Sequence, residues 1–142
     1  MVKQLSVFLE NTKGRLAEMT EVLREAELDL LALSIADTTS FGIARAIVSD
    51  NEKAVKVLQE AGFTVHLNDV LAVVVPDHPG GLSEVLNIML KHDISVEYLY
   101  SFVRNPGTNA IILFKLDNPA VAGKLMRESG VELLSKDDLG KL

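Results

Sequence analysis

Residues 70–89 read VLAVVVPDHPGGLSEVLNIM and change from a strand pattern to a helix pattern. Residues 70–75 form an apolar, partly β-branched run of the length of a buried strand. The Pro-Gly pair at 79–80 is a turn signal. Apolar side chains then recur at helical spacing at Leu82, Val85 and Met89. The stretch therefore predicts a strand, a tight turn and an amphipathic helix in succession.

The same pattern occurs twice in the chain. Five residues of the first copy recur 66 positions later: Leu5, Val7, Leu16, Glu18 and Leu33 correspond to Leu71, Val73, Leu82, Glu84 and Leu99. The offset rises to 67 for residues 50–51 against 117–118 and for Leu58 against Leu125, and to 68 for Gly62 against Gly130, which suggests two single-residue insertions. Two copies of this length indicate duplicated domains, because a solenoid needs at least about three shorter repeats. We expect one domain at 1–68 and a second at 69–142.

Each copy reads as the order βαββαβ. In the first copy we expect strands at 5–9, 28–35, 43–48 and 63–67, with helices at 16–26 and 54–61. In the second copy we expect strands at 70–75, 95–103, 110–116 and 131–134, helices at 82–89 and from Pro119, and a type II turn at 104–107. Right-handed crossovers place both helices of a unit on one face of an antiparallel sheet. The predicted fold class is α+β, with two ferredoxin-like sandwiches in tandem.

The junction between the copies suggests a strand exchange. Only Asn68 and Asp69 separate the last strand of the first copy from the first strand of the second, and a two-residue connection is typical of a hairpin. Such a hairpin pairs residues 63–67 with the second copy, giving a joint sheet with swapped last strands. In the alternative, residues 63–67 pair with residues 5–9 of their own copy.

Composition excludes several classes of protein. A chain of 142 residues with 48% hydrophobic content can bury a core without disulfides. Its net charge of −6 repels a phosphate backbone, so no nucleic-acid partner is expected. No apolar run approaches the roughly 20 residues of a membrane span, and the N-terminus does not resemble a signal peptide. We therefore expect a soluble, cytoplasmic protein with no membrane partner.

The sequence offers no catalytic motif. His66, His78 and His92 lack the spacing of metal ligands, and the absence of Cys removes thiol nucleophiles and Cys-containing zinc sites. Neither a P-loop, a dinucleotide-binding fingerprint nor a nucleophile elbow is present. We expect no enzymatic activity, no cofactor and no metal.

Residues 74–86 resemble the first strand, Pro-Gly turn and first helix of ACT domains, the amino-acid-sensing modules of metabolic regulation, and residues 91–96 resemble the exit from that helix. The first copy departs at Lys13, where the family often has Pro, but retains Gly14. The resemblance implies side-by-side pairing of domains, a homodimer, and effectors bound at the interface by the first strand-to-helix loop. Because no residues remain for a catalytic domain, it also implies regulation of an enzyme in trans.

Physical chemistry points to the same two loops as an amino-acid site. Glycine at a helix N-terminus lets backbone N–H groups approach a ligand carboxylate, and oxygens at Asn11 and Asp77 can accept hydrogen bonds from its ammonium group. The candidate ligand-binding residues are Asn11, Thr12, Lys13, Gly14, Arg15, Leu16, Asp77, His78, Pro79, Gly80, Gly81, Leu82 and Tyr98. The loop at 77–82 matches the family better, whereas Lys13 and Arg15 make the loop at 11–16 more attractive to an anion.

Each assignment has a structural alternative. Asp77 can cap the helix or turn, Lys13 and Arg15 can be solvated charges, and Tyr98, like Tyr100, can serve packing. For the whole chain, the alternative is a protein–protein interaction module whose loops hold no ligand. Branched-chain, aromatic and small polar amino acids all remain compatible with the pattern.

Overall fold

A computed structural model describes residues 1–10, 12–37, 40–102 and 109–142. The chain divides into two compact units, which we call the N-terminal unit (Lys3–Asn68) and the C-terminal unit (Met1–Val2 with Asp69–Leu142). The turn predicted at 104–107 lies outside the described residues. Within the described part, no helix has the length and apolar character needed to cross a membrane.

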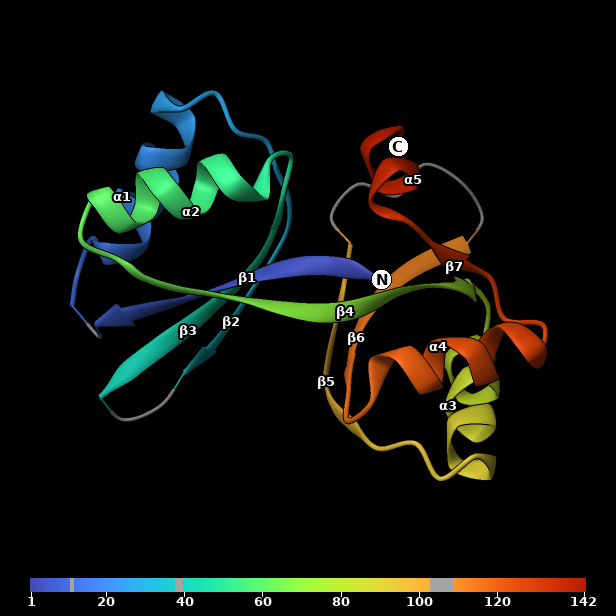
Figure 1. Cartoon of the computed structure of the whole chain (residues 1–142). Coiled ribbons are helices and arrows are strands. Elements are labelled where there is room, and N and C mark those ends of the chain that lie inside the picture. The colour runs from blue at the N-terminus through green and yellow to red at the C-terminus, as the bar shows by residue number, and fades with distance from the viewer. Residues whose placement is uncertain (11, 38–39, 103–108) are drawn as a thin grey trace. The chain divides into compact units, whose positions relative to one another are not determined.

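The N-terminal unit has the predicted βαββαβ order (Figure 1). Its elements are β1 (Val2–Glu10), α1 (Arg15–Glu25), β2 (Leu30–Asp37), β3 (Phe41–Val48), α2 (Asn51–Glu60) and the first part of β4 (Thr64–Pro76). The strands follow the order β2-β3-β1-β4, and β3 is antiparallel to both β1 and β2. Alternate β1 residues such as Leu5 and Val7 are buried with Met19 of α1 and Leu58 of α2. One sheet face therefore carries both helices and the core.

The C-terminal unit repeats this arrangement. Its elements are the second part of β4, α3 (Gly81–Lys91), β5 (Val96–Ser101), β6 (Asn109–Leu116), α4 (Pro119–Glu128), β7 (Leu133–Leu134) and α5 (Lys136–Gly140). The strand order is β5-β6-β4-β7, and the core joins Leu71 and Val73 to Met89 of α3 and Met126 of α4. The predicted fold class, two tandem ferredoxin-like units, is confirmed.

Helix α5 and the short strand β7 differ from the prediction. The strand predicted at 131–134 contains only Leu133 and Leu134, and α5 was not expected. A capping box starts α5, in which Ser135 Oγ accepts from the Asp138 N–H while the Asp138 carboxylate accepts from the Ser135 N–H. The Ser-x-x-Asp spacing at residues 135–138 is the sequence signal from which the start of α5 could have been predicted.

The predicted strand swap is wrong. Residues 68 and 69 are extended, so β4 continues through the junction instead of turning. Its first part lies beside β1, where Ser6 Oγ donates to Asn68 Oδ1 at 2.6 Å and the Phe8 and His66 ring centres are 5.8 Å apart. In the C-terminal unit, β7 pairs with residues 72–73 of β4. The junction lacks glycine and neither residue has the positive φ that a type I′ turn requires.

The offset of 67 predicted around residue 50 is also wrong. The cap residues of α2 and α4 are Asp50 and Asn118, which are 68 apart. The fully buried residue that corresponds to Leu58 is accordingly Met126, not the partly buried Leu125. Both additional residues of the second copy therefore precede β6.

Candidate ligand-binding site

The two strand-to-helix loops share one backbone geometry. Gly14 and Gly80 are the N-cap residues of α1 and α3, with φ of 89° and 90°. This left-handed conformation strains residues that carry a Cβ. The loops also share a turn, in which the Thr12 N–H donates to the Glu10 carbonyl at 2.7 Å and the His78 N–H donates to the Pro76 carbonyl at 3.0 Å. The glycines predicted here are therefore required by the backbone.

Helices α1 and α3 begin without a side-chain cap. By contrast, the Asp50 side chain caps α2 by accepting from the Lys53 N–H, and the Asn118 side chain caps α4 by accepting from the Val121 N–H. The first-turn amides of an uncapped helix keep their capacity to donate, and the helix dipole favours an anion there. The interpretation of Asp77 as the cap of α3 is wrong, because Gly80 occupies the cap position and no side chain caps it.

A cavity of about 300 Å³ lies beside the first loop, within the N-terminal unit. Its lining consists of Leu9, Glu10, Thr12, Arg15, Leu16, Ile35, Asp37 and Gly42. Three of these, Thr12, Arg15 and Leu16, were predicted as site residues. Sequence reasoning missed two acidic residues of the lining. Glu10 directly precedes the first loop, so its position was a usable signal, whereas sheet pairing brings Asp37 there, because Leu9 pairs with Gly42 and Gly42 pairs with Asp37.

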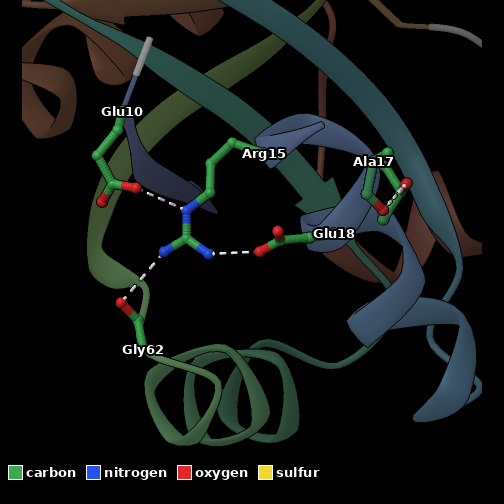
Figure 2. A network of polar contacts seen from close by, with 6 residues as sticks. Glu10, Arg15, Ala17, Glu18 and Gly62 are labelled. Carbon is green, nitrogen blue, oxygen red and sulfur yellow. Dashed lines mark hydrogen bonds and ion pairs between the residues drawn. The ribbon is translucent and has the colours of Figure 1, made fainter. Parts of the chain in front are cut away.

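Arg15 forms one wall of this cavity and is held by a polar network (Figure 2). Its Nε lies 2.9 Å from Glu10 Oε2 and its Nη1 donates to Glu18 Oε2 at 2.7 Å. Its Nη2 donates to the Gly62 carbonyl at 3.4 Å, and its guanidinium carbon lies 3.8 Å from the centre of the Phe63 ring. The side chain is only 15% exposed, so the interpretation of Arg15 as a solvated charge is wrong.

The network also fixes the charge of Arg15. The hydrogen bond with Glu18 raises the pKa of the Arg15 guanidinium, and the neighbouring charge of Glu10 raises it further against the opposing effect of desolvation. Arg15 is therefore a permanent cation between two carboxylates. Its remaining capacity to attract a ligand anion is reduced by the charges that it already neutralises.

The other predicted residues of the first loop are less involved. Lys13 is exposed and does not line the cavity, and Asn11 lies outside the described residues. Gly14 lines a different hollow of about 470 Å³, along α1, together with Ala17, Glu18, Glu21, Val22, Glu25, Ala61 and Phe63. Among the described residues, no three His, Asp or Glu side chains are grouped as a metal site would need.

The second loop is exposed and stands apart from a nearby cavity. Asp77, His78, Pro79 and Gly80 are all exposed, and Leu82 is 37% exposed. A cavity of about 290 Å³ in the C-terminal unit includes Pro76 and Glu84 but none of the predicted residues 77–82. The residues of the second loop therefore repeat the backbone turn of the first loop, but they do not form the wall of this cavity.

Tyr98 is not brought together with the second loop. Its neighbour Leu99 pairs with Phe114, a core residue on the helix side of the sheet, so Tyr98 lies on the opposite face. There its ring stacks with Tyr100 at 6.4 Å between centres. The packing interpretation agrees with this position.

Comparisons with known proteins identify a family and a shared fold. A family model described as an ACT domain pair matches residues 1–142. A solved protein from Bacteroides thetaiotaomicron is 42% identical, covering 99% of this chain and 96% of that one with a TM-score of 0.92. Two regulatory subunits of aspartate kinase share the fold. That of Thermus thermophilus is 13% identical, with a TM-score of 0.63, and the match covers 89% of this chain and 91% of that one. That of Thermus flavus is 14% identical, with a TM-score of 0.60, and the match covers 89% of this chain and 90% of that one. No curated protein matches.

Proposed function

Because the chain belongs to the family of ACT domain pairs, we propose that it is a regulatory protein that binds an amino acid and acts on a partner. The observation that carries this proposal is the cavity of about 300 Å³ beside the first loop of the N-terminal unit. Its lining includes Arg15 and Leu16 at the uncapped start of α1, together with Thr12, Glu10 and Asp37. No catalytic group is needed for such a role.

The cavity suits the two charged ends of an amino acid. The first-turn amides of α1 can donate to its carboxylate, with Thr12 beside them. Asp37 can accept from its ammonium group, because Glu10 is already engaged by Arg15. Leu9, Leu16 and Ile35 supply the apolar wall for a side chain. This division favours a small or medium-sized apolar side chain.

The second loop has the same turn and an uncapped helix, but its predicted residues do not line a comparable cavity. We therefore place the effector in the N-terminal unit, although the second loop has the closer match to the family pattern. We further propose a cytoplasmic homodimer that regulates an enzyme in trans. Light scattering after gel filtration tests the dimer, and a pull-down with and without the effector tests the enzyme partner.

Thermal-shift assays against the twenty amino acids test ligand binding. A ligand that binds only the folded protein stabilises it, by about 2.7 kcal/mol at one hundred times its dissociation constant. We expect one apolar amino acid at millimolar concentration to raise the melting temperature. Asp37→Asn should remove that shift, and Asp137→Asn, the same change on an exposed residue of α5, should retain it.

If none of the twenty amino acids shifts the melting temperature, or if both variants behave like the wild type, amino-acid binding at this cavity is rejected. The alternative of an interaction module without a ligand then takes its place. In that case the pull-down should recover the same partner whether or not amino acids are present.

A further inference from the structure

The cavity of the C-terminal unit is not used by the proposed function. It is lined by Val74, Pro76, Glu84, Val85, Ile88, Asn109, Ser129, Gly130, Val131 and Glu132, and has a volume of about 290 Å³. These residues come from β4, α3, the start of β6 and the segment between α4 and β7. The cavity therefore lies between elements of one unit.

The N-terminal copy shows what such a cavity accommodates. With the offset of 66 before the β-hairpin and 68 after it, four residues of the cavity have counterparts in the Arg15 network: Pro76, Glu84, Gly130 and Val131 correspond to Glu10, Glu18, Gly62 and Phe63. Glu10, Glu18 and Gly62 lie around the guanidinium of Arg15 (Figure 2), and the centre of the Phe63 ring lies 3.8 Å from its central carbon. The counterpart of Arg15 itself is Gly81, which has no side chain. The second copy thus retains the glutamate and the glycine of these surroundings, has Pro76 and Val131 in place of Glu10 and Phe63, and lacks the guanidinium.

The charge of the site is also retained. Glu84 keeps the position of Glu18, and the carboxylate lost where Pro76 replaces Glu10 is matched by Glu132, which lines the same cavity. Within the described residues, neither Glu84 nor Glu132 forms an ion pair or a side-chain hydrogen bond. Gly130, whose counterpart Gly62 accepts from Arg15, also lines the cavity. Two exposed carboxylates that line one cavity can accept from a cation with several donors.

We propose that this cavity binds the guanidinium group of a small molecule. A guanidinium presents five donors in a plane and is weakly hydrated, so it can lie against an apolar wall such as Val131 while its edge meets carboxylates. The volume is near the lower limit of small-molecule sites, which suits a metabolite the size of an amino acid. This site lies in the other unit from the proposed effector site and does not depend on it.

Binding is tested by calorimetry and amide NMR with three probes on the full chain. Methylguanidinium has no amino-acid group, and L-citrulline is a neutral analogue of L-arginine. We expect methylguanidinium and L-arginine to bind at one site with millimolar affinity and to shift the amides of Glu84 and Val131, with L-arginine binding more tightly. L-citrulline should not shift them. Equal effects of L-arginine and L-citrulline would overturn the proposal.

Variants then assign the site. Glu84→Gln and Glu132→Gln should each weaken methylguanidinium binding about tenfold, the effect of losing about 1.4 kcal/mol. Glu128→Gln, an equal change of charge on α4 outside the cavity, should leave it unchanged. Unchanged methylguanidinium binding in both cavity variants would overturn the proposal. It would also be overturned if L-arginine bound no more tightly than methylguanidinium, because a site that contacts only the guanidinium group is what an arginine side chain of a protein needs.

One arginine of the chain itself needs a separate control. Arg104 belongs to residues 103–108, outside the described residues, and close in sequence to Asn109. Arg104→Ala should leave methylguanidinium binding unchanged. A marked gain of affinity in Arg104→Ala would show that the chain supplies its own guanidinium, which would overturn the proposal of a small-molecule ligand.

Discussion

At the scale of single residues, position 15 of the first copy and position 81 of the second show how neighbours determine what a site tolerates. Arg15 extends across two carboxylates and the Phe63 ring. At Gly81, an added Cβ would lie 1.9 Å from the Pro76 carbonyl oxygen, a backbone atom that cannot turn aside as a side chain can. The two copies can therefore not exchange these residues.

Replacement of Gly81 by alanine tests this close approach. Gly81→Ala should destabilise the protein by about 1–3 kcal/mol, the usual cost of an overpacked site. Gly140→Ala is the matched control, because its added Cβ meets nothing within 4 Å, and its effect should stay within about 1 kcal/mol. Urea unfolding measures both variants. Equal stabilities would mean that the β4 to α3 turn can relax.

At the scale of elements, the four long helices fall into two classes by their first residue. Helices α2 and α4 start at side-chain caps, whereas α1 and α3 start at left-handed glycines. Each unit therefore has one helix with a first-turn amide bonded to a side-chain cap and one helix without such a bond, although the Arg15 and Gly81 N–H groups donate to loop carbonyls. This difference makes α1 and α3 the candidates for an effector site, and the cavity beside the first loop favours α1.

The cap of α2 gives a prediction for an element. Asp50→Ala removes the acceptor that lies 3.1 Å from the Lys53 nitrogen, and should lower the free energy of unfolding by about 1 kcal/mol. Asp50→Asn keeps an acceptor at the same position and should lose clearly less, since Asn and Asp are similar caps. Chemical denaturation compares the two. If Asp50→Asn lowers the free energy of unfolding as much as Asp50→Ala does, the effect comes from the charge of Asp50 and not from capping.

At the scale of the whole molecule, the described residues of each unit contain a core on the helix side of the sheet, and one strand belongs to both units. The first core centres on residues such as Leu5, Met19 and Leu58, and the second on Phe114 and Met126. Strand β4 provides the last strand of the N-terminal unit and the first strand of the C-terminal unit. Because the residues of each of these cores come from one unit, damage to one core should act mainly on that unit.

Hydrogen exchange tests the independence of the cores. Met126→Ala removes a fully buried side chain and should cost about 2–5 kcal/mol. Amide exchange should accelerate mainly in residues 69–142, and Leu58→Ala, the matched change in the first copy, should accelerate it mainly in residues 3–68. Equal acceleration throughout the chain in both variants would show that the two units open as one.

The sequence by itself determined the duplication, the βαββαβ order and the two glycine turns, because alternation, helical spacing and turn chemistry are local signals. It did not determine the course of β4, since two residues at 68–69 fit either a hairpin or a continuous strand until their pairing partners are known. Tertiary structure alone decided the surroundings of Arg15, because Gly62 lies 47 positions away. Long-range contacts likewise brought Asp37 to the cavity beside the first loop. The physical reason for this difference is that burial and pairing join residues distant in the sequence, and no local sequence pattern contains that information.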